Sequence, residues 1–330
     1  MSKYHSPELL QYPFDQYQRY RLMAEVLDRL RNPGEIFQIL EVGGLRGLAR
    51  KFMSQDQVMI SDLFSEGQSL DLLASAEAIP FPDRSFPVVI AADFLEHLRP
   101  DARAAALQEM ARASSDLVLI SAPFQYALAR EAEKMVFDFI RDWLGYEHKY
   151  LKEHLQYPTP NLTETESELV KAGFDTIILP NGQIERWLLM MLGYYYFEAF
   201  PSALEVRKEL SGFYNRHFFF KDLAEPAYRY LIIAGRKRLR EKPEALKDLL
   251  EKKHIDPEPD YEKLKLWMES FRAGEVRRMF QKISGLEEAL KEKDDEIKHL
   301  RAYLSELEDF HQRVKASLAY RIYARIFKRK

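Results

Sequence analysis

The stretch IFQILEVGGLRGL, residues 36–48, decides the fold. Its first seven residues are mostly apolar or β-branched, which predicts a strand, and the glycines after Glu41 predict a tight turn before a helix resumes at Leu48. Such a turn at the carboxyl end of a parallel strand lets backbone N–H groups approach a cofactor closely. The turn lacks the residues of a phosphate-binding loop, and Glu41 would repel a pyrophosphate, so we expect a cationic or hydroxyl-rich ligand.

Composition places the chain among globular proteins and excludes several kinds of site. The chain has 330 residues, of which 46% are hydrophobic, enough for about two domains. Its net charge of -3 argues against a nucleic-acid partner. The sequence has no cysteine, which excludes disulfides, thiolate catalysis and cysteine-based zinc sites. No apolar run is long enough to span a bilayer and the first thirty residues are too polar for a signal peptide, so we expect a cytoplasmic protein.

Further apolar runs predict the rest of a sheet. They cover residues 58–60, 86–92, 117–120, 174–179 and 227–235. Asp62 closely follows the second strand, where an acid reaches a ribose hydroxyl in doubly wound folds. Strands alternating with helical segments predict an α/β fold with its ligand at the carboxyl ends of the strands.

A second stretch, LDLLASAEAIPFPDRSFPVVIAADFLEHL at residues 70–98, completes a recognisable pattern. With the glycine turn it resembles the class I S-adenosylmethionine-dependent methyltransferases that act on small molecules. The resemblance implies a seven-stranded, mostly parallel Rossmann-like sheet with helices on both faces, and S-adenosylmethionine as the cofactor. The cofactor-binding residues that it implies are Glu41, Gly43, Gly44, Gly47, Asp62, Ser75, Ala76, Glu77 and Asp93.

Three positions depart from the family's pattern. Leu45 stands where the turn usually has a glycine, Ser75 replaces an acid that contacts adenine, and Pro87 replaces the acid that usually follows Ser-Phe. A side chain at position 45 has to point away from the cofactor, or the pocket is partly blocked. Two interpretations remain open: an enzyme with a modified turn, and a degenerate domain that has lost its cofactor.

Three histidines are candidates for the general base that a hydroxyl acceptor would need. His148 and His154 lie in a polar, aromatic segment after the predicted strand at 117–120, on the expected acceptor side, and His97 follows the predicted strand at 86–92. His148 and His154 are six residues apart, a spacing that does not place them on one helical face. We therefore expect no metal site. For each histidine taken singly, a structural or solvated role is the alternative.

The C-terminal part of the chain has a different pattern. We divide the sequence into a methyltransferase domain at 1–240, a linker rich in proline and charge at 241–262, a coiled coil at 263–313 and a basic amphipathic helix at 314–330. Apolar residues on a heptad seam predict the coiled coil and, with it, a homo-oligomer. They are Ile283, Leu286, Leu290, Ile297, Leu300, Leu304, Leu307, Val314 and Leu318. The last helix has no acidic residue and fits an anionic membrane surface; a contact with another protein is the alternative.

This combination of parts resembles bacterial enzymes of surface-polysaccharide assembly. The resemblance implies an O-methyltransferase that acts on a sugar or glycolipid at the cytoplasmic face of the membrane, where the chain is peripheral. One alternative is a non-catalytic scaffold that recruits glycosyltransferases through its coiled coil. Another is a methyltransferase of quinones or other small lipids, with its acceptor site at the apolar run of residues 187–200.

Overall fold

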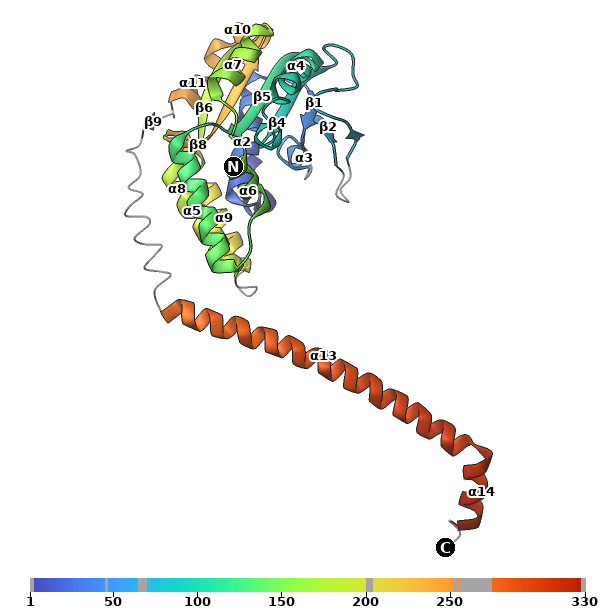
Figure 1. Cartoon of the computed structure of the whole chain (residues 1–330). Coiled ribbons are helices and arrows are strands. Elements are labelled where there is room, and N and C mark those ends of the chain that lie inside the picture. The colour runs from blue at the N-terminus through green and yellow to red at the C-terminus, as the bar shows by residue number, and fades with distance from the viewer. Residues whose placement is uncertain are drawn as a thin grey trace. The chain divides into compact units, whose positions relative to one another are not determined.

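The computed structural model describes residues 3–44, 47–64, 70–199, 204–251, 254–255 and 275–327 (Figure 1). The chain divides into two compact units, Met1–Pro259 and Asp260–Lys330. Each unit has its own architecture. The larger one contains the sheet.

The larger unit alternates strands and helices along the chain. Its strands are β1 (Gln38–Val42), β2 (Gln57–Asp62), β3 (Leu72–Leu73), β4 (Phe86–Ala92), β5 (Ser114–Pro123), β6 (Asp175–Gln183), β7 (Ala224–Glu225), β8 (Ala227–Gly235) and β9 (His254–Ile255). Its α-helices are α1 (Pro7–Leu10), α2 (Phe14–Leu30), α3 (Leu48–Phe52), α4 (Arg103–Ala113), α5 (Ala127–Leu144), α6 (Lys149–Gln156), α7 (Leu162–Lys171), α8 (Ile184–Glu198), α9 (Leu204–His217), α10 (Lys237–Glu241) and α11 (Lys247–Glu251). Short 3-10 helices are η1 (Lys3–His5), η2 (Leu95–His97), η4 (Phe219–Asp222) and η5 (Pro243–Leu246).

Seven of the described strands form one sheet in the order β3-β2-β1-β4-β5-β8-β6. The strands from β3 to β5 pair in parallel, and β8 runs antiparallel to both β5 and β6. The predicted seven-stranded, mostly parallel Rossmann-like sheet is therefore confirmed. This strand order brings the carboxyl ends of β1, β2 and β4 side by side, where the glycine turn and the predicted acids lie.

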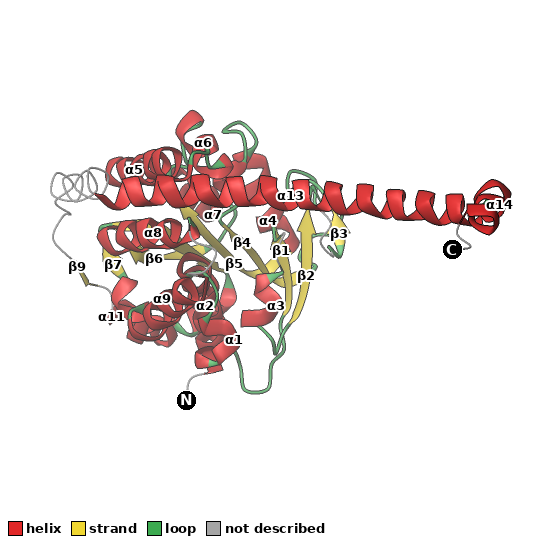
Figure 2. Ribbon diagram, turned by 90° about the horizontal axis from the view of Figure 1, so that it is seen from below, coloured by secondary structure: helices red, strands yellow, loops and turns green. Residues whose placement is uncertain are grey.

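Alternate residues of the strands supply two separate hydrophobic cores, one on each face of the sheet. Residues such as Ile39 and Ile90 pack with α2 and α3 on one face. Their neighbours Leu40 and Val89 pack with α4 and α7 on the other. Figure 2 shows the strands of this unit enclosed between helices. Because both faces are covered, the central strands are apolar along their whole length, which explains why their positions could be read from the sequence.

The larger unit continues past the expected boundary at residue 240. Leu246 and Leu249, from η5 and α11, are fully buried in the core beside α2. The Arg29 guanidinium of α2 also donates to both carboxylate oxygens of Asp248, each at 2.8 Å. Residues 241–251 thus belong to the folded unit, and the remainder of the expected linker, apart from 254–255, lies outside the described residues.

The smaller unit consists, in its described part, of the helices α13 (Glu275–Ala316) and α14 (Leu318–Phe327). The apolar seam residues from Ile283 to Leu307 are all exposed in the single chain, with Leu290 at 67%. The chain leaves the helix at Ser317, so residues 314–316 end α13 and the basic helix begins at Leu318 rather than at 314. Among the described helices, none combines the length and apolar character needed to cross a bilayer.

Candidate active site

The structure gathers the predicted cofactor residues at one edge of the sheet. Gly43, Gly44 and Gly47 lie between β1 and α3, Asp62 ends β2, and Ser75 follows β3. The register pairs Val42 of β1 with Ser61 of β2, and Glu41 with Ile90 of β4. The carboxyl ends of these strands are therefore level, as a shared ligand site requires.

Glu41 is a buried acid whose carboxyl group lies beside Gly44 of the glycine turn. Its side chain is fully buried, and its Oε1 accepts a hydrogen bond from the Tyr20 hydroxyl at 2.7 Å. Burial raises the pKa of Glu41 to about 7, in opposition to the Tyr20 hydrogen bond and the Arg19 charge. A Cβ added to Gly44 would come within 2.4 Å of the Glu41 carboxyl carbon, so the carboxyl occupies the space that any side chain there would need.

Gly43 is required by its backbone conformation and by its neighbour. Its φ is +80°, and a Cβ there would lie 2.2 Å from the ring of Phe94, which follows β4. The close approach of Phe94 ties the turn after β1 to the loop after β4. Leu45, the departure from the family pattern, lies outside the described residues.

The acid and the loop for which the resemblance implies contacts with the ribose and the adenine lie at the end of β2 and after β3, and those contacts stay predictions. Asp62 uses Oδ1 to accept from the backbone N–H of Phe64 at 3.1 Å, which orders the start of the loop. In the loop after β3, Ser75 Oγ accepts from the Glu77 N–H at 3.2 Å, and Ala76 between them is buried. The hydroxyl of Ser75 therefore stabilises its own turn, where the family has an acid.

Asp93 joins three elements instead of offering a free carboxylate. It follows β4 with a φ of +49°. Arg229 of β8 donates to both of its oxygens, at 2.6 and 2.5 Å, and Arg19 of α2 also contacts it. Burial alone would raise the pKa of Asp93, but the two guanidinium charges outweigh it and hold that pKa below its usual range. Asp93 therefore holds Arg19 and Arg229 in position, and its contact with the cofactor stays a prediction.

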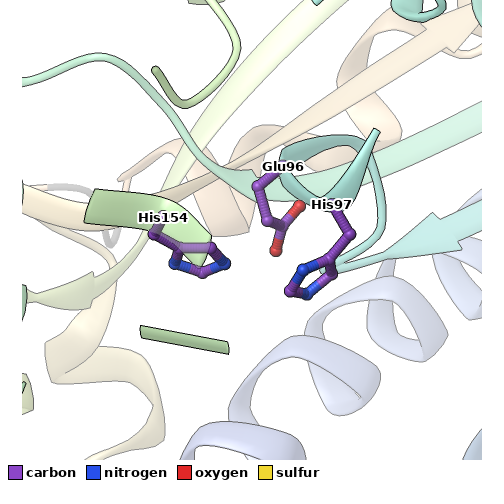
Figure 3. A group of neighbouring side chains, drawn as sticks. All are labelled: Glu96, His97 and His154. Atoms are coloured by element: carbon purple, nitrogen blue, oxygen red, sulfur yellow. The ribbon is translucent and has the colours of Figure 1, made fainter. Parts of the chain in front are cut away.

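Of the three candidate histidines, His97 and His154 lie together. Their ring centroids are 5.0 Å apart, and Figure 3 shows the carboxylate of Glu96 between the two imidazoles. His154 Nδ1 lies 2.9 Å from Glu133 Oε1 of α5, which also accepts from the Tyr228 hydroxyl at 2.8 Å. His154 is only 9% exposed, so it is not the solvated helix residue that its sequence context also allowed.

Their surroundings shift the protonation of these groups in different directions. Burial, with the nearby charge of Asp93, raises the pKa of Glu96 to about 8. Burial, with the neighbouring His154, lowers the pKa of His97 to about 4. For His154 burial alone would lower the pKa, but Glu133 outweighs it and raises the pKa above its usual value.

His148 has a different role. It is the residue before α6, and its Nδ1 accepts from the Leu151 N–H at 3.4 Å, which caps the helix. Its ring packs edge-on against Tyr195 of α8 with 5.6 Å between centroids. The structure therefore gives His148 a structural role and leaves His97 and His154 as the candidates for proton transfer.

Several buried polar atoms at this edge have no hydrogen-bond partner among the described residues. They include Oε2 of Glu41, Oε2 of Glu96, Oγ of Ser121 and both side-chain polar atoms of Asn181. Glu41, Ser121 and Asn181 lie toward the carboxyl ends of β1, β5 and β6, and Glu96 lies just after β4. An unmatched buried polar group costs about 1–3 kcal/mol, so water or a polar ligand is expected to complete the hydrogen bonds of these atoms.

The comparison with protein families finds one match, within the larger unit. A family model described as "Methyltransferase domain" matches residues 48–117, from α3 to the early part of β5. No curated protein matches the sequence. The match and the Rossmann-like fold support a S-adenosylmethionine-dependent methyltransferase, with S-adenosylmethionine as its cofactor.

Three solved structures with a similar fold have low sequence identity to this chain. A SAM-dependent methyltransferase from Archaeoglobus fulgidus is 16% identical with a TM-score of 0.41, over 66% of this chain and 94% of that one. A putative methyltransferase from Bacillus halodurans is 17% identical with a TM-score of 0.36, over 65% and 98%. Phosphoethanolamine N-methyltransferase 2 from Haemonchus contortus, in complex with S-adenosyl-L-methionine, is 14% identical with a TM-score of 0.41, over 71% and 58%. We transfer none of their activities to this chain.

Sequence reasoning missed the residues that support the site from a distance. Four residues from α2, α5 and β8 each contact a residue that the sequence predicted for the site. They are Tyr20 beside Glu41, Arg19 and Arg229 beside Asp93, and Glu133 beside His154. No short motif contains them. In the sequence, the one indication of an acid near these histidines was Glu96, which directly precedes His97 in the segment LEHL at residues 95–98.

Proposed function

We propose that this chain is a S-adenosylmethionine-dependent O-methyltransferase of a sugar or glycolipid in surface-polysaccharide assembly. The observation that carries the proposal is the glycine turn at the edge where open α/β folds bind cofactors, together with buried polar atoms of Glu41 and Glu96 that have no partner among the described residues at the ends of the adjacent strands β1 and β4. A nucleoside with an amino-acid tail has the hydroxyl, amino and carboxylate groups to match them. Asp62 would bind the ribose, and backbone N–H groups of the turn would face the methionine part.

Bound S-adenosylmethionine supplies a methyl group that is already electrophilic. The chain has to align the acceptor oxygen with the carbon–sulfur bond and to remove the hydroxyl proton. As the new carbon–oxygen bond forms, the carbon–sulfur bond breaks and the sulfur leaves as a neutral thioether. The group formed by Glu96, His97 and His154 is the described polar cluster that suits the removal of the proton.

The choice of a sugar or glycolipid follows from the resemblance to polysaccharide enzymes and from the C-terminal unit. The exposed heptad seam of α13 fits a second copy of the same helix, which would make the enzyme a homo-oligomer. The helix α14 combines apolar side chains, such as Ile322 and Ile326, with Arg321 and Arg325. Several such helices on one oligomer would bind an anionic membrane more strongly than one.

Cofactor binding can be measured by isothermal titration with S-adenosylmethionine. We expect the full chain to bind, and Asp62→Asn to lose roughly tenfold to hundredfold in affinity, because a hydrogen bond to a charged group contributes about 1.5–3 kcal/mol. Asp295→Asn, which changes an exposed aspartate of α13, should bind as tightly as the unchanged chain. Undetectable binding by the full chain would contradict catalysis and favour the non-catalytic scaffold.

The acceptor can be sought by mass spectrometry of surface glycans from cells with and without this protein. The proposal expects glycans lacking the protein to be lighter by the mass of one or more methyl groups. Unchanged glycans with altered quinone or lipid methylation would instead favour the small-lipid alternative.

The membrane contact can be tested by co-sedimentation with vesicles that contain an anionic lipid. The full chain should sediment with these vesicles, and a chain that ends at residue 313 should not. Neutral vesicles serve as the control, because the attraction depends on the basic residues of the tail. Equal sedimentation of the two chains would refute the membrane role of the tail.

A further inference from the structure

Glu96, His97 and His154 have a feature that proton removal alone does not require. Within the described residues, they form a group in which one possible ligand atom from each lies within 4.8 Å of the others. Glu96 and His97 come from η2, and His154 comes from α6. In Figure 3 the Glu96 carboxylate lies between the two rings, so all three side chains converge on one point.

Two atoms of this group are buried without a partner. They are Oε2 of Glu96 and Nε2 of His154. The two residues are 4% and 9% exposed. Buried polar atoms of native proteins almost always have a partner, so a water molecule or a cation is expected between them.

The environment of His154 favours a cation. Its Nδ1 lies 2.9 Å from the Glu133 carboxylate, and Tyr228 donates to the same carboxylate oxygen. Metal-binding histidines typically have this support, because a carboxylate on one ring nitrogen fixes the tautomer that leaves the other nitrogen free to bind. His97 has a longer contact of the same kind, 3.4 Å from its Nδ1 to Glu153 Oε2.

We propose that Glu96, His97 and His154 bind one divalent transition-metal ion, with Zn²⁺ as the probe. Two imidazoles and one carboxylate are the ligands of many catalytic zinc sites, whereas Mg²⁺ and Ca²⁺ prefer oxygen ligands. Ligand atoms around a tetrahedral zinc lie about 3.4 Å apart at bond lengths of about 2.1 Å. The donor atoms therefore have to approach one another by about 1.4 Å at most, which side-chain rotation can provide.

Three protein ligands leave a coordination position open. An acceptor hydroxyl bound there would lose its proton to solvent near neutral pH, as metal-bound water does, and its oxygen would then attack the methyl carbon. With the ion bound, the group removes the proton through the ion, and the three side chains are ligands and not the base. This role of the ion rests on the proposed methyl transfer. Binding of the ion does not.

The test uses the full chain, freed of metal with a chelator and then titrated with Zn²⁺ by calorimetry. We expect one tight site per chain and a higher melting temperature with zinc. Glu96→Gln and His154→Gln should each weaken binding at least tenfold. His217→Gln, which removes an exposed imidazole outside the group, should leave the affinity for zinc unchanged.

Glu133→Gln is a second kind of variant, because residue 133 would not bind the ion itself. Glutamine keeps a hydrogen-bonding group beside His154 but removes the carboxylate that supports this ring, so zinc binding should weaken about tenfold to a hundredfold. Far-ultraviolet circular dichroism shows whether each variant is folded. The proposal is overturned if the unchanged chain binds no zinc, or if His217→Gln loses as much binding as His154→Gln. Titration of the metal-free chain with S-adenosylmethionine separates the two proposals. If the chain binds S-adenosylmethionine but no zinc, the metal site is refuted and the proposed methyltransferase function is not.

Discussion

Replacing Glu41 by glutamine should change how the stability of the protein depends on pH. Burial raises the pKa of Glu41 from 4.5 to about 7, so the folded protein holds this proton more tightly than the unfolded chain does. The stability that the proton provides is complete below pH 4.5 and is lost as the pH rises through 7. At about 1.36 kcal/mol per pH unit, the whole effect is about 3 kcal/mol, of which about 2.5 kcal/mol falls between pH 5 and pH 8.

The glutamine variant has no proton to lose but keeps an oxygen that can accept from Tyr20. Urea unfolding of both proteins at pH 5 and pH 8, without added cofactor, measures the difference. We expect the free energy of unfolding of the unchanged protein to fall relative to Glu41→Gln by about 2.5 kcal/mol over this interval. Glu77→Gln, at an exposed carboxyl, controls for the chemical change itself. Parallel pH dependences for the unchanged protein and Glu41→Gln would refute the reasoning.

Three further predictions concern other parts of the molecule. Asp93→Asn should lower the free energy of unfolding by about 3–5 kcal/mol in urea, because it leaves the buried guanidinium of Arg229 without its anion; a loss below about 1 kcal/mol would contradict this. Gly44→Ala should destabilise the turn by about 1–3 kcal/mol and weaken S-adenosylmethionine binding in calorimetry, because its Cβ collides with the Glu41 carboxyl, whereas Gly285→Ala has free space and should do neither; equal effects would show that the turn is not tightly packed. Removing residues 281–330 should convert an oligomer into a monomer in sedimentation velocity, and an unchanged number of chains per particle would refute self-association through α13.

The central strands could be predicted because burial on both faces makes them continuous apolar runs. The predicted bounds 86–92 and 227–235 coincide with β4 and β8. By contrast, β3 consists of two residues, Leu72 and Leu73, and is a strand only because it pairs with Ser61 and Asp62 of β2. β5 and β6 are longer than predicted for the same reason, since pairing with β8 extends them beyond their apolar segments. Pairing partners cannot be read from local sequence.

The site divides in a similar way. The positions of the glycine turn and Asp62 at the carboxyl ends of β1 and β2 could be predicted because each directly follows or ends an apolar strand in the sequence, and their contact with the cofactor stays a prediction. The roles of the histidines could not. His148 and His154 look alike in sequence, but His148 caps a helix, whereas His154 faces Glu133 and lies beside His97. These differences depend on how α5, α6 and η2 pack, and that information is spread over distant parts of the sequence.

The helix α2 provides Tyr20 to Glu41 and Arg19 to Asp93, so it holds one acid at the end of β1 and another just after β4. A protein shortened by its first thirty residues would therefore lose more than an outer layer: it would open two acids to water and remove one wall of the place where the methyl donor is expected. For the same reason, a label or immobilising tag is better attached elsewhere than near α2.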